Sequence, residues 1–166
     1  SLQSINFKNK KALIRVDFNV PLNAQFQVTD STRIVSAKPT IMKVLEDGGS
    51  CVLMSHLGRP ESKESAFSLK HIVRTLETVL GVEVLFSSSC IGEDAQKFCD
   101  NLKPGQILLL ENLRYHSDET RGSENFAKEL SKLGDFYIND AFGTAHRAHA
   151  STTIIAKFFP ENRCFG

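Results

Sequence analysis

The sequence has no excess of charge of either sign and no long apolar segment. Its 20 Lys and Arg residues balance 19 Asp and Glu residues, which leaves a formal net charge of +1. A general nucleic-acid-binding protein usually carries a strong basic excess, so we expect no nucleic-acid partner. No apolar run approaches the roughly 18 residues that would span a membrane, and the first nine residues contain no apolar region typical of a signal peptide. We therefore expect a soluble, cytoplasmic protein without a membrane partner.

Several motifs that would indicate a particular chemistry are absent. The sequence contains neither G-x-G-x-x-G nor G-x-x-x-x-G-K-[ST], so a dinucleotide fingerprint and a P-loop are excluded. The four cysteines form no C-x-x-C pair, which favours free thiols in a reducing compartment. The segment "HRAH" places His146 and His149 three residues apart, but no H-E-x-x-H frame or matching cysteine set accompanies it. We predict no metal site and no nucleotide site in this chain.

Apolar runs alternate with amphipathic segments five times along the chain. The apolar runs predict strands over residues 11–16, 51–55, 82–86, 106–110 and 135–139. The segments between them predict helices over residues 32–47, 69–80, 93–102 and 123–132. Pro39 removes a backbone hydrogen bond from a helix interior, so we expect the regular part of the first helix to start near it.

This order of elements is typical of right-handed βαβ units. It predicts an α/β fold, a three-layer Rossmann-like domain around a mostly parallel sheet with helices on both faces. The length of 166 residues is that of a single domain. Segments 61–68 and 117–124 are expected to be polar surface loops. After Ser151 the pattern weakens, and we expect no further regular element in the final "FFPENRCFG".

Polar and charged side chains follow four of the five predicted strands. Ligands of open α/β sheets bind at the carboxyl ends of the strands, so these residues are candidates for a site. They are Asp17 and Asn19 after the first strand, His56 and Arg59 after the second, Glu111, Asn112, Arg114 and His116 after the fourth, and Asp140, His146, Arg147 and His149 after the fifth. The third strand ends in "SSSC", which offers no comparable chemistry.

Three of these strand ends pair an arginine with a nearby histidine. Arginine suits the planar, forked recognition of carboxylate or phosphate groups. Gly58 and Gly143 would let backbone N–H groups approach an anion. Because the cluster is compact and the rest of the chain is neutral, a small ligand with two anionic ends fits better than a long polyanion. The alternative is that these side chains are ordinary solvated surface residues.

The segments "RVDFNVPL", "TRI", "SHLGRP", "ENLRYH" and "NDAFGTAHRAHAS" occur in this order and are spread across essentially all 166 residues. Together they resemble the N-terminal domain of the phosphoglycerate kinases. The resemblance implies a glycolytic kinase, a transferase that moves a phosphoryl group between 1,3-bisphosphoglycerate and ADP to give 3-phosphoglycerate and ATP. It also implies that a C-terminal domain binds ADP or ATP with Mg²⁺, and that hinge closure brings the two domains together.

The resemblance assigns roles to individual positions. Asp17 and Asn19 would hold the hydroxyl and carboxyl end of the glycerate, with the backbone around Phe18 alongside. Arg33 would be the catalytic residue, facing the transferred group and stabilising its charge. The residues implied to clamp the phosphate that is not transferred are His56, Arg59, Arg114 and Arg147, with His146 beside them.

The resemblance also implies what is missing. Residues 1–166 would be a single N-terminal, glycerate-binding domain, and the nucleotide-binding domain of the family would be absent from this chain. We expect a monomer that is inactive alone, because domain closure completes such sites. Tyr115 stands where Phe is commoner in the "ENLRFH" motif, and we expect this exchange to be silent.

Two other classes of function remain open from the sequence. One is a stand-alone module that binds a phosphorylated metabolite tightly without catalysis. The other is a structural or interaction domain in which the Arg and His side chains only cap strand ends. The first predicts tight, specific binding by this chain alone, and the second predicts no phosphate affinity.

Overall fold

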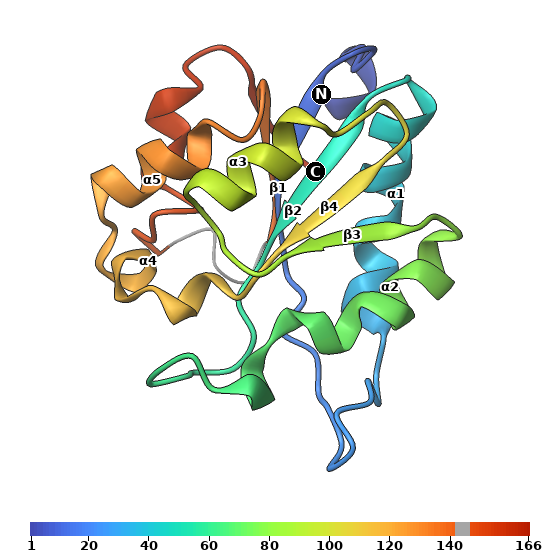
Figure 1. The fold of residues 1–166 in the computed structure, drawn as a ribbon. Coiled ribbons are helices and arrows are strands. Elements are labelled where there is room, and N and C mark those ends of the chain that lie inside the picture. The colour runs from blue at the N-terminus through green and yellow to red at the C-terminus, as the bar shows by residue number, and fades with distance from the viewer. Residues whose placement is uncertain (142–146) are drawn as a thin grey trace.

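A six-stranded parallel sheet forms the centre of the structure, a computed structural model that describes residues 1–141 and 147–166 (Figure 1). The strands are β1 Lys11–Val16, β2 Ser50–Met54, β3 Val84–Ser87, β4 Ile107–Leu110, β5 Phe136–Asp140 and β6 Arg163–Phe165. Their order is β3-β4-β2-β1-β5-β6, and every neighbouring pair is parallel. In the middle of the sheet, Leu13 of β1 pairs with Val52 of β2 on one side and with Tyr137 of β5 on the other.

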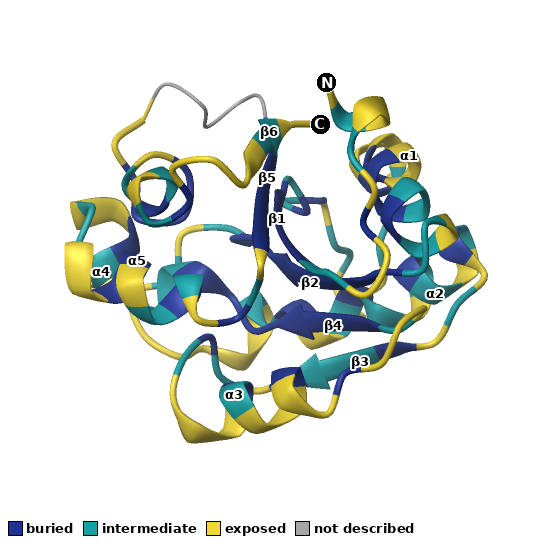
Figure 2. Ribbon diagram, turned by 90° about the horizontal axis from the view of Figure 1, so that it is seen from above, coloured by how far each residue is buried: buried dark blue, intermediate teal, exposed yellow. Residues whose placement is uncertain are grey.

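Helices cover both faces of the sheet, which confirms the predicted three-layer α/β fold (Figure 2). The helices α1 Thr32–Glu46 and α2 Val73–Leu80 lie on one face. The helices α3 Glu93–Asp100, α4 Ser117–Arg121 and α5 Glu124–Ser131 lie on the other. Short 3₁₀ turns occupy Leu2–Ser4, Ser65–Phe67, Leu69–Ile72, Leu113–Tyr115 and Ile154–Phe158.

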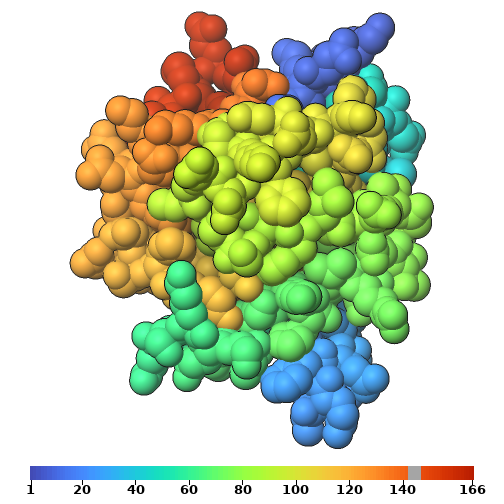
Figure 3. Space-filling model, viewed as in Figure 1, coloured from blue at the N-terminus to red at the C-terminus, as the bar shows by residue number. Residues whose placement is uncertain are grey.

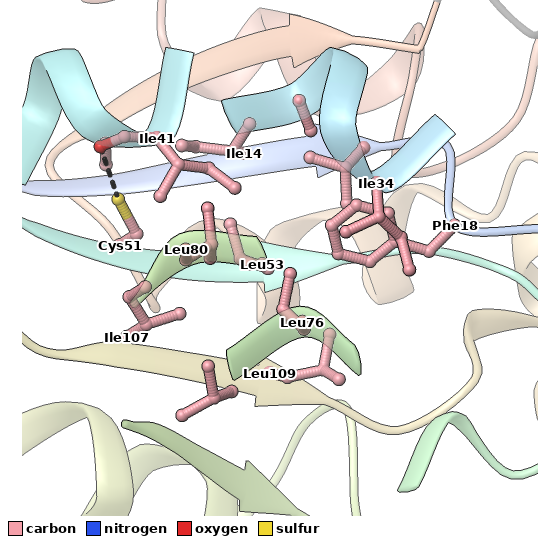
Figure 4. Close-up of a cluster of buried hydrophobic side chains, with 14 of the residues drawn as sticks. Ile14, Phe18, Ile34, Ile41, Cys51, Leu53, Leu76, Leu80, Ile107 and Leu109 are labelled. Carbon is pink, nitrogen blue, oxygen red and sulfur yellow. Dashed lines mark hydrogen bonds between the residues drawn. The ribbon is translucent and has the colours of Figure 1, made fainter. Parts of the chain in front are cut away.

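Each face of the sheet has its own apolar core. Ile14, Leu53 and Leu109 point from β1, β2 and β4 toward α1 and α2, where they meet residues such as Ile34 and Leu76 (Figure 4). The intervening strand residues, Leu13 among them, join the second core under α3 and α5. Strands buried on both faces carry unbroken apolar runs, which explains why the pattern of the sequence revealed them.

The first helix begins seven residues before Pro39, at Thr32, so the expected start near the proline was wrong. Pro39 lies on the exposed side of the helix, as does Val35, whose carbonyl would otherwise accept the missing hydrogen bond. Water can solvate that carbonyl, so the loss of the hydrogen bond destabilises the helix less than it would on a buried face. The buried stripe of Ile34, Ala37 and Ile41 holds the first turns onto the sheet.

Two further elements were not expected. The segment 117–124, predicted to be a loop, contains α4, whose Glu119 is fully buried by contacts with residues far away in the sequence. The last residues form β6, which pairs with β5 through Ile138 and Cys164. Neither segment shows a regular spacing of apolar residues, so the sequence did not predict these elements. Contacts with distant parts of the chain stabilise both.

Some predicted boundaries also move. The helix expected over 69–80 consists of the 3₁₀ turn Leu69–Ile72 followed by α2, and the Ser68 side chain accepts a hydrogen bond from the backbone of Lys70 at its start. The strand expected from residue 82 begins at Val84, and the helix expected to reach residue 102 ends at Asp100. In the described part of the chain, no helix is long and apolar enough to cross a membrane.

The loop between β1 and α1 extends away from the carboxyl end of the sheet. Figure 3 shows this loop, in blue, against the green surface of the segment before α2. Phe26 of the loop stacks on His71 of that segment, with ring centroids 4.6 Å apart. The contact ties the loop to the neighbouring β2–α2 connection, and both connections contribute residues to the site described next.

Candidate active site

A pocket of about 330 Å³ lies where the connections that follow β1, β2, β4 and β5 meet. Because parallel strands present their carboxyl ends at one edge, residues distant in the sequence gather there. The lining residues are Asp17, Asn19, Arg33, His56, Gly58, Arg59, Arg114 and Arg147. The pocket therefore contains all the residues to which the resemblance assigns a role except Phe18 and His146. Of the other strand-end candidates, His116 and His149 line an adjoining hollow, and Glu111, Asn112 and Asp140 line neither.

Phe18 and His146 have different positions. The Phe18 side chain is fully buried in the core under α1 (Figure 4). Its backbone N–H donates to Ser55 Oγ at 2.9 Å. Phe18 thus anchors the start of the loop, with Asp17 and Asn19 on either side of it at the pocket. His146 lies outside the described residues.

Arg33 connects the start of α1 to the loop that follows β1. Its Nη1 donates to the Asn19 carbonyl at 2.6 Å and lies 3.4 Å from Asp17 Oδ1. The Asn19 N–H also donates to Asp17 Oδ1, at 3.2 Å. The Arg33 side chain is 52% exposed, and both of its contacts with Asn19 and Asp17 are made by Nη1. Such a guanidinium is held in place yet remains available to a ligand.

Gly58 brings the loops after β1 and β2 together. Its N–H donates to Asn19 Oδ1 at 2.8 Å. The backbone has φ of +62°, in the left-handed region that glycine adopts most easily, and a Cβ here would lie 2.5 Å from the Phe67 ring. A larger residue would move this loop and weaken the hold on Asn19.

Three arginines, Arg59, Arg114 and Arg147, line this pocket and also an adjoining hollow of about 630 Å³. Among the described residues, none of the three guanidinium groups has an ion-pair partner. The buried Nε of Arg114 has no hydrogen-bond partner there either. Burial lowers the pKa of Arg114; the Glu119 carboxylate opposes this shift, and the charges of Arg147 and Arg59 add to it. An anion bound between them would relieve this repulsion and satisfy the unpaired donors.

His56 is neutral and has a fixed partner on one side. Its Nδ1 lies 2.9 Å from Nη2 of Arg15. Burial, and then the positive charges around it, lower the pKa of His56 to about 3. A neutral imidazole can still donate one hydrogen bond to an anion, from the ring nitrogen that carries the proton.

Several supporting residues were not predicted as such. Glu111 and Asn112 were noted at the end of the fourth strand, but neither lines the pocket. Glu111 accepts from the Leu69 N–H at 2.8 Å. Asn112 donates to the Leu57 carbonyl at 2.7 Å and accepts from the Arg114 N–H at 3.0 Å. These contacts fix the loop that carries His56 and Arg59. No local sequence pattern predicts these contacts.

The pocket is suited to an anion and not to a metal ion. Asp17 is the one carboxylate in a lining that contains four arginines. In the described part of the chain, no group of three or more His, Cys, Asp or Glu side chains is placed to hold a metal. The residues present therefore do not fit Mg²⁺, which prefers carboxylate and phosphate oxygens.

Comparisons with known proteins agree with this chemistry. A family model described as "Phosphoglycerate kinase" matches residues 2–166. Proteins named phosphoglycerate kinase from Porphyromonas gingivalis and Chlorobium phaeovibrioides are 45% and 48% identical, over 100% and 96% of this chain but 46% and 41% of their own lengths. The solved phosphoglycerate kinase of Pyrococcus horikoshii is 31% identical with a TM-score of 0.88, over 99% of this chain and 42% of that one. The chain thus spans less than half the length of these relatives.

Proposed function

The chain belongs to the phosphoglycerate kinase family, and we propose that it supplies the glycerate half of an active site that transfers a phosphoryl group between 1,3-bisphosphoglycerate and ADP. The products in that direction are 3-phosphoglycerate and ATP. The observation that carries the proposal is the group of three arginines without ion-pair partners in the described residues, gathered with Asp17, Asn19 and Arg33 around one pocket.

The pocket offers different chemistry for each end of such a ligand. Arg59, Arg114 and Arg147, with the neutral His56, are proposed to hold the phosphate that is not transferred, and His146 would stand beside them. Guanidinium groups suit this task because their planar donors match phosphate oxygens. At the other end, Asp17 and Asn19 would hold the hydroxyl and the carboxyl end of the glycerate, next to the Phe18 backbone.

Arg33 is the proposed catalytic residue. Phosphoryl transfer needs accurate positioning and stabilisation of the charge on the equatorial oxygens more than covalent assistance. A guanidinium supplies that stabilisation without gaining or losing a proton. The contacts of Arg33 with Asn19 and Asp17 hold it beside the proposed glycerate end of the pocket.

The nucleotide is proposed to bind elsewhere in the intact enzyme. The pocket residues do not form a Mg²⁺ site, so ADP or ATP with its Mg²⁺ would bind to a C-terminal domain of the intact protein. That domain would be the main partner of this chain, and closure of the two would exclude water and complete the site. A cytoplasmic location follows from the proposed glycolytic role.

Isothermal titration calorimetry with 3-phosphoglycerate tests the proposal on this 166-residue chain. We expect weak but measurable binding, and a loss of at least tenfold in Arg147→Ala, because one charge-assisted contact contributes about 1.5–3 kcal/mol. Arg121→Ala is the matched control, since Arg121 is an exposed arginine paired with Asp118 outside the pocket.

The outcomes distinguish the three classes of function. Millimolar binding that depends on Arg147 supports the kinase half-site. Submicromolar binding by the chain alone would favour a stand-alone metabolite-binding module. No binding, or equal losses in Arg147→Ala and Arg121→Ala, would favour a structural domain and would contradict the proposal.

A further inference from the structure

A buried chain of hydrogen bonds runs from α4 to His56. The Glu119 carboxylate accepts from the backbone N–H of Ser151 at 2.9 Å and from its hydroxyl at 2.5 Å. The Ser151 hydroxyl oxygen lies 2.9 Å from Nε of Arg15, and Nη2 of Arg15 lies 2.9 Å from Nδ1 of His56. Glu119, Ser151 and Arg15 are all 0% exposed. Four segments that are distant in the sequence are thus connected below the pocket floor.

The chemistry of the groups fixes the direction of every bond. A guanidinium has donors only, so Arg15 must donate to Ser151 Oγ. The Ser151 hydroxyl hydrogen is then directed to the Glu119 carboxylate, which is an acceptor when ionised. For the same reason Arg15 must donate to His56 Nδ1, which therefore carries no proton. The proton of the neutral ring is then on Nε2, the nitrogen that Arg15 does not hold.

Glu119 also balances the charge of Arg15. An isolated buried guanidinium is costly, and burial lowers the pKa of Arg15. The carboxylate of Glu119 is the largest influence that raises it again. Without this partner, the fully buried Arg15 would lose its closest compensation, and its contact with His56 would weaken. Removing one partner from a buried charged network usually costs more than the net value of the bond.

We propose that Glu119 and Ser151 are positioning residues for the anion pocket, and that they act through Arg15 to hold His56 as the Nε2–H tautomer. His56 lines the pocket, so this tautomer presents an N–H donor to a bound anion. That the anion is the phosphate of a glycerate rests on the proposed function, whereas the tautomer of His56 does not.

The test is a two-bond ¹H–¹⁵N correlation spectrum of the histidine rings in the 166-residue chain, which distinguishes the two neutral tautomers. It is recorded for the wild type, Ser151→Ala and Glu119→Gln, each with and without 3-phosphoglycerate. Tyr137→Phe is the matched control, because the Tyr137 hydroxyl donates to the Ser151 carbonyl at 2.7 Å and takes no part in the chain to His56. That variant loses a buried hydrogen bond to the same residue but leaves the positioning contacts intact.

We expect the wild type and Tyr137→Phe to show His56 protonated on Nε2 alone. In Ser151→Ala and Glu119→Gln we expect a mixture of tautomers and about tenfold weaker binding of 3-phosphoglycerate. A wild-type His56 protonated on Nδ1 would overturn the proposal, and this result needs no variant to fold. So would an unchanged Nε2–H tautomer in both variants. A changed tautomer in a chain that binds no 3-phosphoglycerate would support the positioning role and contradict the proposed function instead.

Discussion

At the scale of single residues, three of the four pocket arginines lie together without an ion-pair partner among the described residues, whereas the fourth, Arg33, lies 3.4 Å from Asp17 Oδ1. Arg121 forms an ordinary exposed pair with Asp118. Arg59, Arg114 and Arg147 share one pocket and have no ion-pair partner in the described residues. Placing like charges close together destabilises the unliganded fold. An anionic ligand removes this repulsion when it binds and so stabilises the protein. Such a site lowers the stability of the unliganded protein and raises its affinity for an anion.

His56 should make the protein less stable as the pH falls from about 6.5 toward 3. Its pKa is about 3 in the fold against an ordinary value of 6.5, so the unfolded chain takes up a proton that the folded chain excludes. The free energy of unfolding contributed by His56 is complete above pH 6.5 and declines below it. Urea unfolding at a series of pH values should show a shallower decline in His56→Asn, which cannot titrate. Parallel pH profiles for the two proteins would refute this expectation.

Tyr115 should contribute to stability, although the sequence predicts a silent exchange with Phe. Its hydroxyl donates to the Glu64 carbonyl at 2.5 Å and ties the loop after β2 to the turn after β4. Tyr115→Phe should lower the free energy of unfolding by about 0.5–1 kcal/mol, since the bond is partly exposed. The loss should be smaller than that in Tyr137→Phe, whose bond is buried. Chemical denaturation that leaves Tyr115→Phe at wild-type stability would restore the original prediction.

The strand-end residues of the site were accessible from the sequence, whereas its support was not. Asp17, His56 and Arg114 each directly follow or closely follow an apolar run, and parallel topology places such ends together. Arg15 and Glu119 act from inside the fold. Arg15 sits within an apolar strand and Glu119 within a polar segment, so only three-dimensional contacts reveal that Ser151 joins them.

At the scale of elements, α1 lacks one of its backbone hydrogen bonds because Pro39 lies inside it. Pro39 lacks the N–H that would donate to the Val35 carbonyl, and both residues are exposed. Pro39→Ala should raise the free energy of unfolding by about 2 kcal/mol. Removing an interior proline stabilises the helix, but alanine also gives the unfolded chain more conformational freedom, which offsets part of this gain. Urea denaturation of Pro39→Ala is compared with Lys38→Ala, which changes a neighbouring exposed side chain and should leave stability nearly unchanged. An equal or lower midpoint for Pro39→Ala would show that α1 depends on the proline.

The elements that the sequence revealed are those with an apolar period of their own. Strands β1, β2 and β4 are buried on both faces and appear as unbroken apolar runs. By contrast, β6 is mostly exposed and is defined by its pairing with β5. The helix α4 is held by the buried Glu119 rather than by an apolar stripe. Sequence patterns record burial well and specific polar contacts poorly.

At the scale of the whole molecule, the sheet supports the pocket at the carboxyl ends of its strands. Two apolar cores fix the strands, and the loops beyond their carboxyl ends carry the charged side chains. Sites built this way keep their geometry because the supporting elements are immobile. The chain spans less than half the length of the relatives it matches, so the pocket corresponds to one part of those longer proteins.

The 166-residue chain alone should form no ATP from 1,3-bisphosphoglycerate and ADP. It contains neither a P-loop nor a dinucleotide fingerprint, and its pocket residues do not fit Mg²⁺. A coupled assay on the pure chain, beside a full-length relative under the same conditions, checks this expectation. Turnover comparable to that of the relative would mean that the chain also binds the nucleotide, contrary to the proposed division of the site.

The most direct test of the central claim is a ¹H–¹⁵N NMR titration of the labelled chain with 3-phosphoglycerate. The account predicts saturable shifts that cluster at the pocket and are lost in Arg147→Ala. The residues expected to shift are Asp17, Asn19, Arg33, His56, Gly58, Arg59, Arg114 and Arg147. Absence of shifts at millimolar ligand, or shifts scattered over the surface and unchanged in the variant, would contradict the claim that this pocket is a glycerate site.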